Sequence, residues 1–267
     1  MNPVIETILK RKSMRVYEKK AISSEVRAEL LRATLRAPTA GNLMLYSIIE
    51  VTDQHIKKKL VETCDNQPFI ARAPLIWLFL ADYQRWVDYF IASGVERLCE
   101  QNKTRMRKPQ EGDLFLACCD AIIAAQTAVI AAESLGLGSC YIGDIMENFE
   151  IQRDLFELPK YVFPICLVCF GYPTAQQIKR KQTTRFQEKF ILFENQYRRL
   201  SVADFEEMFS EENNAQASRS QEELAGARGA RDARNVGQLI YTRKFNADFS
   251  KEMSRSVRAI LKAWLEE

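Results

Sequence analysis

Runs of apolar positions divide the chain into short and long segments. Three short runs, at residues 45–51, 75–81 and 162–170, are bounded by turn residues and predict buried strands. Helical spacing of apolar residues predicts helices over residues 3–9, 24–37, 56–64, 85–98, 114–135 and 149–159. A short strand is expected near residues 139–145, and a charged loop near residues 101–111. We find no internal repeat and no clean domain boundary.

The last quarter of the chain has a different pattern. Residues 212–236 are poor in large apolar side chains and predict a solvated or mobile excursion. The segment that follows places its apolar residues on one helical face: Phe249, Met253, Val257, Ile260, Leu261 and Trp264. This pattern predicts an arm that docks at a distance, with another subunit as one candidate surface.

Composition narrows the class of protein. The chain has 267 residues, of which 47% are hydrophobic, as in ordinary globular proteins. A net charge of +3 is too small to indicate a nucleic-acid partner. The longest apolar stretch contains Asp120, Gln126 and Glu133, so a buried helix explains it better than a membrane span. No long apolar run opens the chain, and we expect no secretory signal and no membrane partner.

The seven cysteines and the single histidine indicate no metal site or disulfide framework. An odd cysteine count predicts free thiols in a reducing, cytoplasmic setting. Cys166 and Cys169 form a C-x-x-C pair, but they lie three apart on an expected strand and should face opposite sides. His55 is expected at the start of a surface helix. Core packing is therefore the favoured interpretation of the cysteine pair, and we predict no metal ligand.

The segment R-K-S-M-R at residues 11–15 carries candidate binding chemistry. In an extended segment Arg11, Ser13 and Arg15 point to one side, with two guanidinium groups and a hydroxyl that suit a phosphate. Alternatively, Lys10, Arg11 and Lys12 only complement the dipole of the first helix.

Three further segments are ambiguous by themselves. Gly41 and Asn42 suit close approach to a flat, hydrogen-bonding ligand, or merely end a helix. Gly136, Gly138 and Gly143 do not have the G-x-G-x-x-G spacing of a dinucleotide fingerprint and could form a simple turn. Arg185 is a second phosphate clamp or a surface charge.

Taken in order, five motifs resemble the nitroreductase family of flavin mononucleotide (FMN)-dependent oxidoreductases. They are R-K-S-M-R-V-Y, A-P-T-A-G-N, A-A-E-S-L-G-L-G-S-C-Y-I-G, F-G-Y-P and T-R-F, spread between Arg11 and about Tyr197. The resemblance implies an α+β, three-layer sandwich with a mixed, mostly antiparallel sheet flanked by helices. The chain most resembles the NADPH-dependent branch of the family, which has a domain-swapped C-terminal arm. We therefore expect a flavin-binding domain at residues 1–197 and an extension at residues 198–267 that packs on the partner subunit.

The resemblance also implies the reaction and its participants. NADPH or NADH would pass hydride to FMN, and a small-molecule acceptor such as a nitroaromatic, a quinone or a free flavin would then take the electrons. The working unit would be a homodimer. No Ser-His-Asp or Cys-His set is evident, so we predict no catalytic side chain.

Site residues follow from the resemblance by position. Arg11, Ser13 and Arg15, with Lys12 beside them, would hold the phosphate and ribityl chain, and Arg185 would contribute on the phosphate side. A loop from the partner subunit would reach the flavin ring through Pro38, Thr39, Ala40, Gly41 and Asn42. Gln67 would touch the flavin. The segment Tyr141, Ile142, Gly143 and Asp144 would bring backbone amides to the ring near N5.

Two departures from the family pattern stand out. Many relatives have Gly-Gly where this chain has Gly143-Asp144, which places a carboxylate near the ring and would disfavour anionic reduced flavin. Leu43, Met44 and Leu45 follow Asn42 where a second polar residue is common. Dehalogenase or flavin-degrading activity on the same fold, or a flavin sensor or store, are alternative functions.

The preference between NADPH and NADH is open at this stage. Arg228, Arg231 and Arg234 could meet a 2′-phosphate, although a solvated arginine run is the favoured interpretation.

Overall fold

Four apolar strands form one antiparallel sheet. They are β1 (Tyr46–Glu50), β2 (Leu75–Asp82), β3 (Gly138–Ile142) and β4 (Val162–Gly171). Their order is β1-β2-β4-β3, and every neighbouring pair is antiparallel. The only parallel pairing among the described residues is an isolated bridge between Ser13 and Ser139. The α+β prediction is confirmed, and the expected mixed sheet is antiparallel in its four strands.

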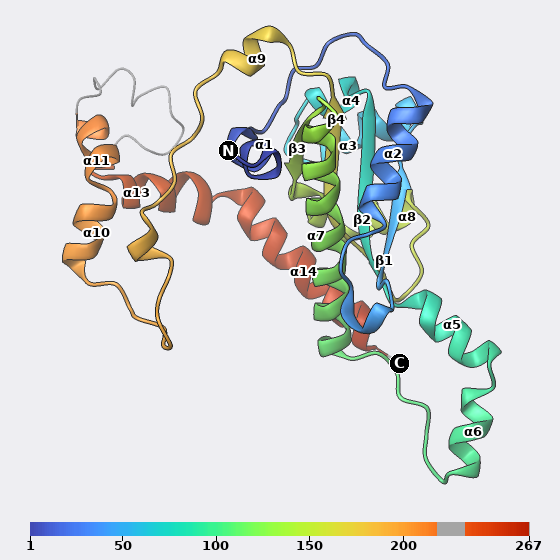
Figure 1. Ribbon diagram of the computed structural model, residues 1–267. Helices are drawn as coiled ribbons and strands as arrows, with labels where there is room; N and C mark the ends of the chain where they lie inside the picture. Colours follow the sequence, from blue (N-terminus) through green and yellow to red (C-terminus); the bar gives the residue numbers. More distant parts are fainter. Residues whose placement is uncertain (218–232, 267) are drawn as a thin grey trace. The chain divides into compact units, whose positions relative to one another are not determined.

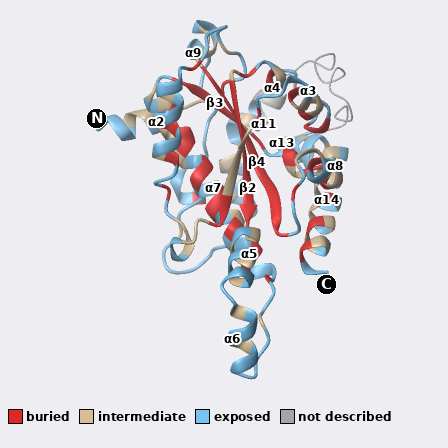
Figure 2. Ribbon diagram, turned by 90° about the vertical axis from the view of Figure 1, so that its right-hand side faces the viewer, coloured by how far each residue is buried: buried red, intermediate tan, exposed pale blue. Residues whose placement is uncertain are grey.

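Both faces of this sheet are covered, which makes three layers. Every residue of β2 and β4 is buried, because helices pack on both sides, and Figure 2 shows these strands in red. One core cluster contains residues of α2 (Ser24–Thr34), α7 (Glu111–Ser134) and α14 (Asp248–Leu265). The other contains residues of α3 (Gln54–Thr63) and α4 (Phe69–Arg72). Cys166 belongs to the first cluster and Cys169 to the second, so their predicted opposite orientation is confirmed.

Helix α7 is the long apolar helix expected from the sequence. A capping box of Gln110 and Asp113 begins it, and small alanines such as Ala121 and Ala124 are fully buried against the rest of the core. By length and composition alone it could cross a membrane. In the structure one face lies in the core, and the other exposes large apolar side chains.

One predicted helix is two helices. We expected a single helix over residues 85–98, but the chain forms α5 (Gln84–Ala92) and α6 (Val95–Gln101). Gly94 separates them with a φ of 74°, a left-handed conformation that ends a helix and that glycine adopts without strain. Apolar spacing continued across this glycine, which is why the pattern alone missed the break.

The structure describes residues 1–217 and 233–266, which form two compact units. The first unit is Met1–Arg180 together with the end of the chain from Glu252, and the second is Lys181–Lys251. Short elements of the first unit are α1 (Pro3–Lys10), η1 (Ala40–Asn42), η2 (Asp144–Met146), α8 (Phe149–Leu155) and α9 (Ala175–Lys179). The second unit contains η3 (Glu188–Phe190), α10 (Val202–Met208), α11 (Ser210–Ala217), α13 (Val236–Ile240) and η4 (Tyr241–Phe245) (Figure 1).

The end of α14 packs on its own chain. Ile260 and Trp264 are 2% exposed, and the Trp264 indole N–H donates to the Gln110 carbonyl at 3.2 Å. The Trp264 ring also meets Tyr161 edge-on at 5.2 Å. We had expected the apolar face of this helix to dock on a partner, but these two side chains are buried within the first unit. Most of the predicted excursion at residues 212–236 lies outside the described residues.

Candidate functional site

The segment after α1 runs beside β3. Ser13 bridges to Ser139, and the Met14 N–H donates to the Ser139 carbonyl at 2.8 Å. Met14 is buried, whereas Arg15 is exposed and its guanidinium lies over the Phe69 ring at 5.9 Å. Backbone pairing with β3 therefore fixes which side chains of this segment face the surface.

Three guanidinium charges act on the beginning of β3. Burial raises the pKa of the Cys140 thiol, and Arg15, Arg11 and Arg180 each oppose that rise. The Arg180 guanidinium also donates to the Ser13 carbonyl. Sequence reasoning missed Arg180, because it follows α9 and meets Ser13 only in the folded chain. These three charges make the beginning of β3 suitable for a phosphate.

Lys12 binds the end of α9, and its predicted contact with the phosphate stays a prediction. Its ammonium donates to the Arg180 carbonyl at 2.7 Å and to the Ile178 carbonyl, both at the end of α9. Close by, burial raises the pKa of Glu133 to about 7, while Arg11 and Lys12 act in the opposite direction. The Oε1 atom of Glu133 is buried without a hydrogen-bond partner among the described residues.

At the other end of β3 the predicted ring contacts come together. The Gln67 amide nitrogen donates to the Cys64 carbonyl at 3.0 Å and to Asp144 Oδ2 at 2.8 Å. A side chain at Gly143 would meet nothing within 4 Å, so its backbone is open to a ligand. From Ser139 to Gly143 the strand advances about 13 Å, enough for a sugar-alcohol phosphate to lie along it.

The loop of Thr39, Gly41 and Asn42 is held separately, on α7. Asp120 is 2% exposed and accepts from the Ala40 N–H at 2.9 Å, the Leu45 N–H at 3.0 Å and the Thr39 hydroxyl. Gly41 and Asn42 have φ values of 56° and 59° and are exposed. Among the described residues, no hydrogen bond joins this loop to Gln67 or Asp144.

Asp120 is a second residue whose role sequence reasoning missed. A carboxylate in an apolar helix was visible in the sequence, but we used it only as an argument against a membrane span. A buried carboxylate must find donors, and here they are the backbone of the loop. On the same helix, Gln126 accepts from the Tyr141 hydroxyl at 3.3 Å. Pro38, at the start of the loop, is exposed, and Ile142 is buried at the end of β3.

Arg185 belongs to the second unit. Its guanidinium donates to the Thr183 hydroxyl at 2.7 Å and to the Thr184 carbonyl at 2.9 Å, so its bonds are local. Its assignment to the phosphate side stays a prediction.

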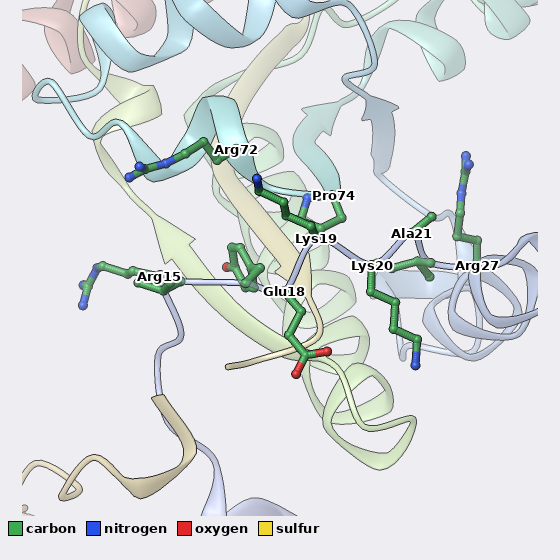
Figure 3. A pocket seen from close by; sticks show the side chains of 11 residues that line it. Arg15, Glu18, Lys19, Lys20, Ala21, Arg27, Arg72 and Pro74 are labelled. Carbon is green, nitrogen blue, oxygen red and sulfur yellow. The ribbon is translucent and has the colours of Figure 1, made fainter. Parts of the chain in front are cut away.

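A cavity of about 740 Å³ lies beside Arg15 but is a poor candidate for an anion site. Of the predicted site residues it contains only Arg15, together with Lys19, Lys20, Arg27 and Arg72. Figure 3 shows that the Arg15, Lys20 and Arg27 side chains extend in different directions. Because charges that diverge do not hold one anion, we place the site along β3 instead.

Known proteins match this chain over most of its length. An FMN reductase [NAD(P)H] from Bacillus subtilis (strain 168) is 33% identical over 195 residues, which are 72% of this chain and 76% of the relative. An oxygen-insensitive NADPH nitroreductase from Salmonella typhimurium is 29% identical over 214 residues, 79% of this chain and 82% of the relative. The solved structure of B. megaterium NfrA2 has 27% identity and a TM-score of 0.78, and the match covers 99% of this chain and 98% of that one. Residues 8–172 match the nitroreductase family, and the chain belongs to that family.

Proposed function

We propose that this protein is an FMN-dependent oxidoreductase that takes electrons from NADPH or NADH and passes them to a small acceptor. Candidate acceptors are nitroaromatics, quinones and free flavin, because similar proteins bear the names NADPH nitroreductase and FMN reductase. The observation that carries the proposal is the layout of β3. Three guanidinium groups act on Cys140 at its beginning, and Gln67 donates to Asp144 at its end.

The residues present fit FMN. Arg11, Arg15 and Arg180 offer charge-assisted donors for one terminal phosphate. Ser13 lies between Arg11 and Arg15 in the chain. The open backbone at Gly143 leaves room for the flat ring. When bound, FMN supplies the hydride chemistry, and the protein supplies binding, orientation and electrostatics.

We also propose that the working unit is a homodimer. Helix α7 exposes large apolar side chains on the face away from the core, including Phe115 at 68% and Leu116 at 49% exposed, with Ile122 and Ile123 further along. Monomers rarely leave such a face in water. A second copy packed there would cover it, and the exposed loop at Gly41 and Asn42, anchored to the same helix by Asp120, would then serve the partner's flavin.

The coenzyme preference and the location remain predictions. Arg228 and Arg231 lie outside the described residues, and the Arg234 N–H donates to Gln238 Oε1 at 2.6 Å. A cytoplasmic location is expected from the free thiols.

Purification followed by a visible absorption spectrum tests the proposal. The protein should be yellow, and heating should release FMN rather than flavin adenine dinucleotide. Added NADPH or NADH should bleach the bound flavin, and a quinone should restore its colour. A colourless protein that binds no added FMN would overturn the proposal.

A further inference from the structure

The end of β3 holds a second carboxyl that the proposed function leaves unused. Glu147 follows η2, three residues after Asp144, and is only 4% exposed. Its Oε1 atom is buried without a hydrogen-bond partner among the described residues. A buried carboxylate with an unsatisfied oxygen is unfavourable, whereas a proton removes the charge and turns the group into a donor.

Three other carboxyls act on Glu147. They belong to Asp144 in η2, Asp65 in the turn between α3 and α4, and Glu252 in α14. Burial is the largest cause that raises the pKa of Glu147, to about 7, and each of these three carboxyls raises it further, Asp144 also as a hydrogen-bond partner. Glu252 itself is held by Arg255 at 2.8 Å and accepts from the Asn148 N–H at 3.1 Å.

The orientation of the Gln67 amide depends on Asp144. Both hydrogens of its amide group are used, one on the Cys64 carbonyl and one on Asp144 Oδ2. The amide oxygen is therefore the group left for a ligand, and it can only accept. This orientation depends on Asp144 being an acceptor held close to Gln67.

We propose that Glu147 is a positioning residue that, as a buried carboxylic acid, donates to Asp144 and thereby keeps the Gln67 oxygen turned toward the flavin. The inference rests on the proposed function, because it names FMN as the ligand of this end. The flavin ring carries an N–H between its two carbonyls, and an acceptor oxygen matches that donor. When Glu147 loses its proton, its carboxylate repels that of Asp144, and Asp144 no longer stays beside Gln67.

Glu147→Gln tests the role of the Glu147 proton. A glutamine amide can donate to Asp144 at every pH, whereas a carboxyl can donate only when it is protonated. The dissociation constant of FMN is measured from pH 5.5 to pH 8.5 for the wild type, for Glu147→Gln and for the matched control Glu157→Gln. Glu157 is an exposed carboxyl that lies ten residues after Glu147 in the chain. The FMN phosphate also ionises near pH 6, about equally for all three proteins, so the ratio of dissociation constants removes its contribution.

The ratio of the Glu147→Gln constant to the wild-type constant should be close to one at pH 5.5. At pH 8.5 the variant should bind about fivefold more tightly than the wild type, the size of one hydrogen bond retained. Glu157→Gln should follow the wild type throughout. A ratio for Glu147→Gln that does not change with pH would overturn the inference.

Infrared spectroscopy on flavin-free protein tests whether Glu147 is protonated. This measurement separates the inference from the proposed function. Because Glu133 also titrates near pH 7, the measurement is made on full-length protein carrying Glu133→Gln. The C=O band of a protonated carboxylic acid should be present at pH 6, lost by pH 8.5, and absent when Glu147→Gln is added. A band that survives Glu147→Gln, or a missing band at pH 6, would contradict a protonated Glu147 even if the protein binds FMN well.

Discussion

The two ends of β3 are built from opposite chemistry. At its beginning, the charges of three guanidinium groups act on Cys140. At its end, burial and neighbouring carboxyls, Asp144 among them, hold the pKa of Glu147 near 7. One end thus favours a dianion such as a phosphate, and the other favours a neutral, hydrogen-bonding group.

The two ends also differ in how the fold supports them. We call the beginning of β3, with Arg11, Arg15 and Arg180, the cationic end. It depends on a backbone bridge between Ser13 and Ser139 and on Arg180 after α9. We call the end of β3, with Asp144 and Glu147, the acidic end. It depends on α14, more than a hundred residues away in the chain. Ser256 accepts from the Phe149 N–H at 3.0 Å and donates to the Met146 carbonyl at 2.6 Å. Damage to α14 should therefore affect the acidic end first.

Trp264→Ala should have the largest effect on stability. The ring is buried against Tyr161 and anchors the end of α14, so its loss should lower the free energy of unfolding by about 3–5 kcal/mol. Leu265→Ala is the control, because Leu265 is 39% exposed on the same helix. Urea denaturation of both variants makes the measurement. Equal losses would show that the end of α14 does not depend on this buried ring.

Arg15→Ala should weaken the cationic end and leave the acidic end intact. Loss of a charge-assisted bond to phosphate costs about 1.5–3 kcal/mol, or more than tenfold in FMN affinity. Lys12→Ala is the matched control, because the Lys12 ammonium donates to carbonyls at the end of α9. Flavin fluorescence titration compares the two. Similar affinities for both variants would mean that the alternation of side chains does not select the phosphate contacts.

Two glycines of the same segment separate folding from binding. A side chain at Gly138 would come within 2.5 Å of Met14 Cγ, so Gly138→Ala should destabilise the fold by about 1–3 kcal/mol. Gly143→Ala meets no atom within 4 Å and should leave the free energy of unfolding nearly unchanged. It should nevertheless weaken FMN binding several-fold, because the new methyl group would occupy the ring position. Thermal denaturation and flavin titration on both variants measure these effects. An unaltered FMN affinity in Gly143→Ala would place the ring elsewhere.

The sequence could predict the features that depend on neighbouring residues in the chain. The strands and most helices followed from apolar spacing, because burial on both faces requires long apolar runs such as β2 and β4. The alternation of Met14 and Arg15 was also predictable, since it depends only on neighbours in an extended segment. The break at Gly94 was not, because spacing continues across it and only the backbone conformation ends α5.

Residues that act across long sequence separations could not be placed in advance. Arg180 joins Ser13 only after α9 is formed, and Asp120 holds a loop about 80 residues earlier in the chain. The same holds for α14: its apolar face was evident, but the surface that covers Ile260 and Trp264 is set by the whole fold. Hydrogen-bond partners of this kind depend on tertiary packing, which a single sequence does not encode in its local pattern.

Glu133 gives the smallest predicted effect, at the cationic end. Burial raises the pKa of this carboxyl to about 7, above its value of about 4.3 in an unfolded chain. Between these two values the folded state binds more protons than the unfolded state. Stability should therefore fall as the pH rises from about 4.3 to about 7, and this contribution should be constant above that range. Because Glu133 is only partly buried, solvent screening limits the loss to about 1 kcal/mol.

Glu133→Gln should remove this part of the pH dependence in flavin-free protein. Urea denaturation at pH 5 and pH 7.5 makes the comparison, with Glu157→Gln as the exposed control. Wild type and control should both lose stability over this interval, and Glu133→Gln should lose about 1 kcal/mol less. The remaining dependence in the variant comes from other carboxyls, including Glu147 at the acidic end. Identical pH profiles for all three proteins would mean that Arg11 and Lys12 keep Glu133 ionised throughout, and that the cationic end contains a permanent ion pair.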